Sequence, residues 1–382
     1  MSFFNFPRPV EQAAAEQLRG EVRAFLGEWM PKVPPLQRAD SWNGFDREFS
    51  LELGRRGWLG MTWPKQYGGH ERSAYERYVV VEETLAAGAP VAAHWIADRQ
   101  SGPLLLRFGN DRQKTILPRI ASGEVSFCIG MSEPDAGSDL AGVRTRAVPV
   151  DGGWVINGTK LWTTNGHRCD YMILFCRTSG TPADRQAGTS QILIDLKNTP
   201  GVSIRPIRDL AGQEHFNETS FVDAFVPADA LIGTEGQGWS QVMSELAFER
   251  SGPERFLSTM TLLIELVRAL EGNGSTAARE AVGRLTAHLA VLRRMSRGIT
   301  VMLEAGENPT LQASIVKDLG ALFEQDLPEI GRLLVEIEPD RTTSNNYQAV
   351  LAHLMMNAPS FSLRGGTREI LRGIIARGLG LR

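Results

Sequence analysis

The chain has 382 residues and a formal net charge of −3. This near-neutral balance gives no reason to expect nucleic acid or an anionic membrane as a partner. No apolar run reaches the roughly 18 residues that a membrane-spanning helix needs, and we see no basic segment followed by an apolar core that would indicate a signal peptide. Three cysteines without metal-like spacing indicate reduced thiols in a cytoplasmic protein and no metal site.

The first third of the chain has the spacing of amphipathic helices. Ser73 followed by Glu76 is a capping box, which predicts the first turn of a helix. The other predicted helices cover residues 11–30, 46–56, 91–100 and 111–117. We therefore predict an N-terminal helical domain over residues 1–123.

From residue 125 the pattern changes to alternation with β-branched and aromatic residues. The predicted strands cover residues 125–131, 143–149, 153–160, 171–177, 190–196, 202–208 and 219–226. Asp151-Gly152 is typical of a tight hairpin between two of them. Because strands and helices do not alternate here, we expect a small β-barrel or sandwich over residues 124–232 and no Rossmann nucleotide site.

The helical period returns after Pro227. The predicted helices cover residues 239–250, 253–271, 276–305, 310–323, 329–337, 347–356 and 368–379, with Pro328 as an interruption. Long amphipathic helices joined by short loops indicate a bundle over residues 233–382. The predicted fold class is a multidomain α+β protein: a helical domain, a β-domain and a helical bundle.

Two short segments are candidate binding loops. Residues 127–139 read FCIGMSEPDAGSD, a strand-like run followed by small, turn-forming residues. Such a loop lets a ligand approach the backbone, and the hydroxyls of Ser132 and Ser138 suit a carbonyl or phosphate oxygen. Alone, this loop is explained as well by a plain strand-to-turn junction. The second segment, residues 157–166, reads NGTKLWTTNG.

Together the two segments resemble the flavin-binding signature of the acyl-CoA dehydrogenase family, whose fold has the domain order predicted above. The resemblance implies FAD as the cofactor, held by Ile129, Met131, Ser132, Gly137, Ser138, Trp162, Thr164, Thr367 and Glu369. In the family pattern, Ser132 and the Met131 backbone hold the pyrimidine side of the flavin ring, Trp162 packs on the ring and Thr164 bonds near N5. Taken alone, Trp162 would be a core aromatic and Thr164 a strand residue.

The reaction also needs a base. Many family members carry a Glu just before Gly-Thr near the C-terminus, but the matching residue here is Gly365, which has no carboxylate. A minority carry the base on the first long helix of the bundle, directly before an Arg, and Glu249-Arg250 fits that position. Glu249 is therefore the candidate base, with Arg250, Gly365 and Ser138 toward the substrate and Glu254 as the second candidate base. A Glu-Arg pair on a solvated helix face explains the same pattern.

Two family segments that hold the adenine half of FAD do not match. Residues 271–290 lack the Phe-Gly-x-Pro-Ile pattern, and residues 354–359 read LMMNAP in place of a glycine-rich stretch. The resemblance implies dehydrogenation of an acyl-CoA to the trans-2-enoyl-CoA, an electron-transferring flavoprotein as acceptor, and a homodimer or homotetramer. The alternatives are an acyl-CoA oxidase, or a partner subunit of a heteromeric dehydrogenase with an incomplete FAD site.

Overall fold

The computed structural model describes residues 5–9, 12–249, 252–272 and 274–381, with the side chains of residues 245–249 left out. By its contacts the chain divides into two compact units. The helical unit comprises Met1–Gly44, Arg72–Val91 and Ala247–Arg382, and the sheet unit comprises Phe45–Glu71 and Ala92–Leu246. Each unit is described by itself below.

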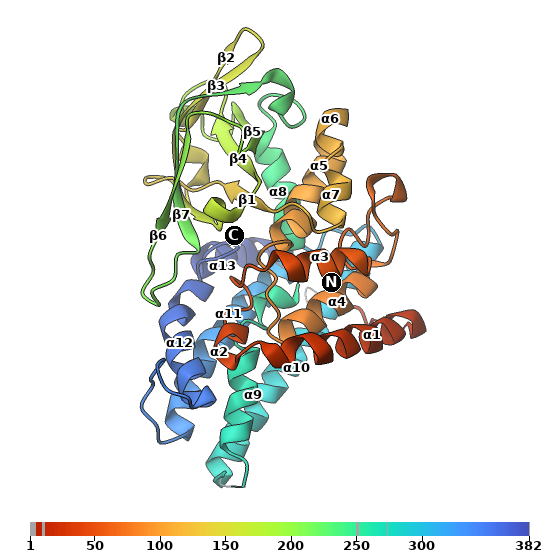
Figure 1. Cartoon of the computed structure of the whole chain (residues 1–382), viewed down its shortest axis with the longest axis vertical. Helices are drawn as coiled ribbons and strands as arrows, with labels where there is room; N and C mark the ends of the chain where they lie inside the picture. Colours follow the sequence, from red (N-terminus) through yellow and green to blue (C-terminus); the bar gives the residue numbers. More distant parts are fainter. Residues whose placement is uncertain (1–4, 10–11, 250–251, 273, 382) are drawn as a thin grey trace. The chain divides into compact units, whose positions relative to one another are not determined.

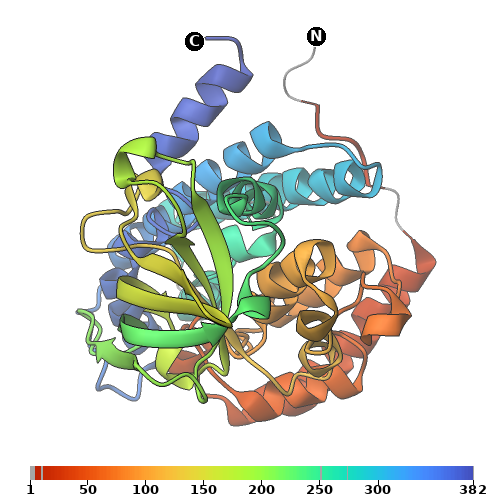
Figure 2. The ribbon, with the colours of Figure 1, turned by 90° about the horizontal axis from the view of Figure 1, so that it is seen from above.

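The sheet unit is built on one curled, seven-stranded sheet (Figures 1 and 2). Its strands are β1 (Phe127–Gly130), β2 (Arg146–Val150), β3 (Gly153–Thr164), β4 (Tyr171–Arg177), β5 (Thr189–Asp195), β6 (Val202–Ile207) and β7 (Phe216–Pro227). The order is β1-β4-β2-β3-β7-β6, with β5 paired to β4. Strands β1 and β2 run parallel to β4, and the other pairs are antiparallel. All seven predicted strands are confirmed.

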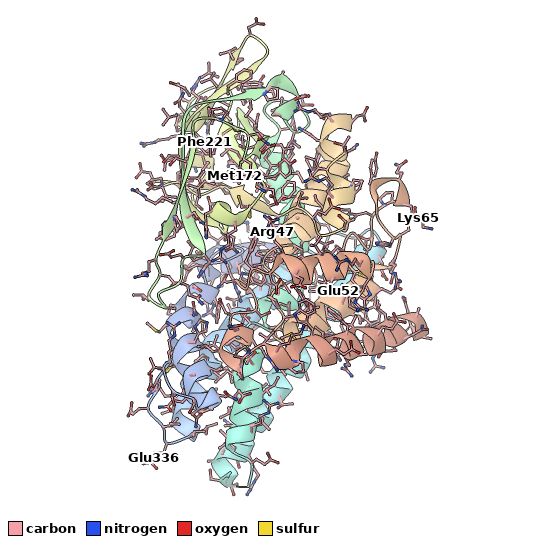
Figure 3. The ribbon with its side chains drawn as sticks, viewed as in Figure 1. Arg47, Glu52, Lys65, Met172, Phe221 and Glu336 are labelled. Carbon is pink, nitrogen blue, oxygen red and sulfur yellow. The ribbon has the colours of Figure 1, made fainter. Side chains whose placement is uncertain are left out.

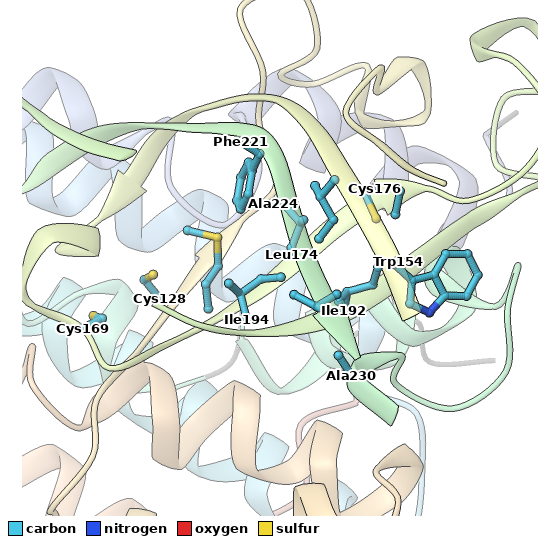
Figure 4. Packing of buried hydrophobic residues seen from close by; sticks show 14 residues of the cluster. Cys128, Trp154, Cys169, Leu174, Cys176, Ile192, Ile194, Phe221, Ala224 and Ala230 are labelled. Carbon is cyan, nitrogen blue, oxygen red and sulfur yellow. The ribbon is translucent and has the colours of Figure 1, made fainter. Parts of the chain in front are cut away.

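The predicted hairpin at Asp151-Gly152 joins β2 to β3, where Val150 pairs with Gly153. Gly152 has a φ of +78°, which glycine adopts without a steric penalty. Alternating residues of these strands form one buried core, in which Phe221, Leu174 and Ile192 lie together (Figure 4). Met172 and Phe221, both labelled in Figure 3, belong to this core. Burial of these faces is the main force that sets the strand register.

The helices of the sheet unit are α3 (Arg47–Arg55), α5 (Gly102–Phe108), α6 (Asp111–Lys114), α7 (Leu117–Ala121) and most of α8 (Gly238–Glu249). The helix predicted over 91–100 is confirmed only in its second half, where residues 95 and 96 are α-helical and a π-helical turn, η3 (Ala97–Ser101), leads directly into α5. Gly102 follows this turn, and a Cβ atom there would stand 2.2 Å from the Trp63 ring. The absence of a side chain lets this turn pack on Trp63, a contact that helical periodicity does not reveal.

The helical unit contains α1 (Ala13–Trp29), α2 (Pro35–Arg38), α4 (Ala74–Ala86), α9 (Met260–Ala269), α10 (Thr276–Glu304), α11 (Thr310–Leu334), α12 (Asn346–Phe361) and α13 (Arg368–Gly378). Helices α10 and α11 run side by side (Figure 2). The Ser73–Glu76 capping box at the start of α4 is confirmed. None of the described helices combines the length and the apolar character that crossing a bilayer requires.

Two predicted helix boundaries of the bundle are wrong. The predicted break at Pro328 is absent, because α11 continues through it and Pro328 is buried with Leu327 and Gly331. Packing of the apolar stripe on both sides of the proline outweighs the lost backbone hydrogen bond. The helix predicted over 253–271 begins later, since Pro253–Arg255 form a 3₁₀ turn, η8, and α9 starts at Met260.

Candidate active site

The first candidate loop leaves the sheet at the end of β1. Met131 and Ser132 are half-buried, whereas Gly137 and Ser138 are exposed. A Cβ atom at Gly137 would have no other atom within 4 Å, so the backbone is open at this point. The hydroxyls of Ser132 and Ser138 have no hydrogen-bond partner among the described residues. The outer side of this loop therefore offers a polar surface to a ligand.

The second candidate segment is the end of β3, where the strand is irregular. The pairing of β3 with β7 shifts its register between Lys160 and Thr163, and Trp162 has a φ of +63°. The indole is 55% exposed and meets the Phe216 ring edge-on at 5.9 Å. Trp162 is thus no core aromatic, and the bulge turns it outward. A positive φ on a bulky residue is rare and favours a functional reason for it.

The buried side chain of Asn217 lies beside this bulge. Asn217 on β7 donates its side-chain amide to the Thr163 carbonyl at 2.9 Å, and its amide oxygen lies 2.7 Å from His167 Nδ1. Asn165, in the left-handed region at φ +53°, donates its backbone N–H to the His215 carbonyl at 2.6 Å. These contacts fix the backbone beside Thr164. Sequence reasoning missed Asn217, because it precedes the strand predicted over 219–226 and only the structure shows that it is buried.

A buried ion pair joins the two candidate segments. The Lys160 ammonium, fully buried, lies 2.7 Å from a carboxylate oxygen of Glu133 and donates to the Met131 carbonyl at 2.9 Å. Glu133 also accepts the backbone N–H groups of Arg144 and Thr145 at 2.7 and 2.9 Å. Burial alone would raise the pKa of Glu133, but Lys160 and these N–H donors outweigh it and hold that pKa below its usual range. Both residues lie inside the flavin-type motifs, yet sequence reasoning did not single them out.

The C-terminal candidate residues lie in the helical unit. Thr367 caps α13 through its hydroxyl, and Glu369 is exposed in the first turn. The pKa of Glu369 lies below its ordinary value because its own backbone N–H and the Thr367 hydroxyl hydrogen-bond to the carboxylate. Both residues are therefore at the solvent side of one helix N-terminus.

The surroundings of Gly365 differ from those of an open loop. Gly365 has a φ of +70°, and a Cβ atom there would lie 3.0 Å from the guanidinium carbon of Arg255. Arg255 is almost completely buried. Arg364, which directly precedes Gly365, forms an ion pair with the buried Glu324 at 2.6 Å, and its guanidinium carbon lies 4.6 Å from the centre of the Trp42 ring. A glutamate at position 365 would therefore need both a strained backbone and a displaced Arg255.

The candidate base is not tested by the structure. Glu249 is the last residue of α8, and its side chain lies outside the described residues, as does the whole of Arg250. Glu254, the second candidate base, is 5% exposed within η8. Glu249, Arg250 and Glu254 stay predictions.

Comparison with known proteins covers almost the whole chain. Family models match residues 12–124 as the N-terminal domain, 128–224 as the middle domain and 236–380 as the C-terminal domain of acyl-CoA dehydrogenases. Acyl-CoA dehydrogenase IpdE1 of Mycobacterium tuberculosis is 33% identical over 96% of this chain and 97% of its own length.

Two solved structures share the fold at similar identity. The steroid acyl-CoA dehydrogenase Tcur3481-Tcur3483 has a TM-score of 0.86 and 29% identity, over 97% of this chain and 98% of that one. A chain of the ChsE4-ChsE5 complex from Mycobacterium tuberculosis has a TM-score of 0.83 and 29% identity, over 98% and 100% of the two chains.

The three matched domains define the class of the protein, which is an oxidoreductase among the flavoprotein dehydrogenases. The matches define it further. The chain belongs to the acyl-CoA dehydrogenase family and is an acyl-CoA dehydrogenase. Members of this family are flavoproteins that act in acyl-CoA metabolism.

Proposed function

We propose that the chain binds FAD and removes two hydrogens from the α and β carbons of an acyl-CoA, giving the trans-2-enoyl-CoA. The observation that carries this proposal is the outward Trp162, 55% exposed on a β-bulge where the preceding residue, Leu161, donates its backbone N–H to the Ser132 carbonyl at 2.8 Å. A strained φ and an exposed indole both cost free energy in the protein without ligand. The flat indole suits packing against the face of a planar cofactor.

The residues present fit the isoalloxazine half of FAD. Ile129, the Met131 backbone and the Ser132 hydroxyl would line the pyrimidine side, and Gly137 leaves space at the loop backbone. Trp162 would cover a ring face and Thr164 would hydrogen-bond near N5. Thr367 and Glu369 would contact the adenosine half, and Ser138 the pantetheine arm of the thioester. When bound, FAD supplies the acceptor for the β-hydrogen, which leaves with its electron pair.

Glu249 takes the α-proton in this proposal. Its carboxylate becomes a carboxylic acid while the α carbon gains the electron pair that forms the new double bond. Arg250 and the unsubstituted backbone at Gly365 shape the substrate side. Support comes from the sequence position directly before an Arg and from the geometry at Gly365, where a Cβ atom would lie 3.0 Å from the Arg255 guanidinium. Electrons would pass from the protein to an electron-transferring flavoprotein.

The acyl group is proposed from the relatives. The solved structure described as a steroid acyl-CoA dehydrogenase supports testing thioesters that carry fused rings, alongside branched substrates such as isovaleryl-CoA. The test is to reconstitute the purified protein with FAD, to add these thioesters and an artificial electron acceptor, and to measure the mass of the product by mass spectrometry. Loss of two hydrogens from one thioester supports the proposal. A protein that takes up FAD but alters no thioester would contradict the reaction.

A second candidate is a subunit of a heteromeric dehydrogenase. Two observations favour it: the adenine-side family segments do not match at 271–290 and 354–359, and both solved structures above carry the names of two proteins. In this case a partner chain would supply the adenine contacts. Gel filtration with and without co-expressed neighbours, together with flavin content, separates it from a homodimer or homotetramer. A stable homo-oligomer with one FAD per chain would exclude the heteromer.

A further inference from the structure

The ion pair between Lys160 and Glu133 has no part in the reaction proposed above, yet both of its side chains are buried in the sheet unit. The Lys160 side chain is 0% exposed and that of Glu133 6%. Removing two charges from water is expensive, and a well-packed apolar pair of the same size is often as stable. The position of this pair therefore asks for a reason beyond stability.

The Lys160–Glu133 pair makes hydrogen bonds to both ends of the first candidate loop. Lys160 donates to the Met131 carbonyl at the start of the loop, at 2.9 Å. Glu133 accepts the N–H groups of Arg144 and Thr145 after the loop has turned back, at 2.7 and 2.9 Å. Residues 131 to 145 thus form a closed segment whose two ends meet at one carboxylate. Between these ends Ala136, Ala141 and Val143 are buried, whereas Gly137 and Ser138 are exposed.

The same pair fixes the second segment. Lys160 is the last residue in regular register before the β3 bulge, and Trp162 follows two positions later with its indole outward. Leu161, between them, donates its backbone N–H to the Ser132 carbonyl at 2.8 Å. Close approach at the base of the site leaves no room for a side chain at Gly130, where a Cβ atom would lie 2.8 Å from Met172 Sδ and 3.3 Å from Lys160 Cγ.

We propose that Lys160 and Glu133 are positioning residues that set the spacing between the loop hydroxyls and the Trp162 indole, and through it the affinity and the electronic environment of bound flavin. This inference rests on the proposed FAD binding. Neither side chain faces the open side of the loop, so their effect passes through Met131, Ser132 and Trp162. A preformed spacing lowers the ordering cost of binding, which is how a remote pair changes affinity.

The test measures FAD binding to the full-length apoprotein by quenching of flavin fluorescence, together with the absorption band and the reduction potential of the bound flavin. In Lys160→Met the Met131 carbonyl loses its donor and the Glu133 carboxylate its cation. We expect FAD to bind at least about tenfold more weakly, with a shifted absorption band and potential. A purely structural role would lower the melting temperature and leave the spectrum and potential of bound flavin unchanged.

A second variant keeps the test decisive if Lys160→Met does not fold. Lys160→Met/Glu133→Gln removes both charges and keeps the side-chain volumes, so no uncompensated charge is buried. It still lacks the donor to Met131, and we expect the same weaker binding and altered flavin spectrum. The matched control is Lys317→Met, which removes another buried lysine that donates to a backbone carbonyl, that of Phe361 at 3.0 Å, in the helical unit.

The outcomes separate this inference from the function on which it rests. Wild-type affinity and spectrum in the double variant would overturn the positioning role while FAD binding stands. Equal weakening by Lys317→Met would also overturn it, because the effect would then be a general loss of stability. A wild-type protein that takes up no FAD would overturn the proposed cofactor and the positioning role together.

Discussion

The flavin-side loops of the sheet unit and the C-terminal segment of the helical unit are built in opposite ways. In the sheet unit, buried polar contacts hold the backbone from beneath, and the outer side keeps Trp162 and the small residues around Gly137 uncovered. In the C-terminal segment, side chains of the same chain fill the space, with Arg255 against Gly365 and Arg364 between Trp42 and Glu324. The first region leaves an open surface that suits the proposed ligand, whereas the second is filled by internal packing.

The largest effect is expected at the base. Glu249→Gln keeps the size of the side chain and removes its ability to take a proton, so turnover should fall by about 10³-fold or more, while bound flavin stays unchanged. Rapid-mixing measurement of flavin reduction checks it. Glu254→Gln is the comparison, and a larger loss in this second variant would move the base to Glu254 and break the assignment.

The next effect tests the packing at Gly365. Gly365→Glu places a Cβ atom 3.0 Å from Arg255 at a φ of +70°, so we expect a loss of roughly 2–4 kcal/mol of unfolding free energy. Chemical denaturation measures it. Gly373→Glu is the matched control, because a Cβ atom there meets nothing within 4 Å. If Gly365→Glu instead restored turnover to the Glu249→Gln variant, the C-terminal segment would be an open site after all.

The stability of the sheet unit at acid pH is expected to depend on the carboxylate of Asp170. Asp170 accepts the backbone N–H and the hydroxyl of Ser126 and pairs with Arg47 and Lys197, which together outweigh burial and lower its pKa from 3.8 to about 2 (Arg47 is labelled in Figure 3). A pKa lower in the folded state stabilises the fold above about pH 4, and this stability is lost as the pH falls toward 2. We expect roughly 1–2 kcal/mol, reduced by solvent screening of the exposed partners.

Thermal unfolding between pH 5 and pH 2 measures this contribution. The Asp170→Asn variant has no carboxylate to protonate, so its melting temperature should fall less steeply over the same interval. Parallel curves for the two proteins would mean that the contacts of Asp170 add nothing to the stability of the sheet unit.

The smallest effect is expected at Trp162. Replacement by Leu removes an exposed ring and leaves the fold intact, so flavin affinity should fall by roughly fivefold, about 1 kcal/mol, with little change in melting temperature. Val148→Ala, at another exposed apolar position of the same sheet, is the control. A large drop in stability with unchanged flavin affinity would mean that Trp162 serves the fold.

The sequence predicts the regular parts of this molecule well because local signals and burial agree there. All seven strands lie where β-branched and aromatic residues predict them, and the Ser73 capping box and the Asp151-Gly152 hairpin carry their own local chemistry. The errors occur where tertiary contact decides. A π-helical turn precedes Gly102, which packs on Trp63, and buried packing lets α11 continue through Pro328.

The candidate site divides in the same way. Small residues, hydroxyls and the tryptophan could be recognised from the motif, since these chemical types point to a ligand. Lys160, Glu133 and Asn217 could not, because their role depends on which strand neighbours bury them, and a lysine in a strand gives no sign of being buried. The contact of Arg255 with Gly365 joins positions far apart in the chain and needed the structure.

The most direct test of the central claim is an anaerobic absorbance titration of the FAD-loaded protein with a panel of acyl-CoA thioesters, including branched and fused-ring acyl groups. We predict that the oxidised flavin band is present and that at least one thioester bleaches it, because the proposed reaction moves the α-proton to Glu249 and the β-hydrogen to the flavin. A flavin band that no thioester of the panel changes, in a protein that binds those thioesters, would contradict the proposed dehydrogenation.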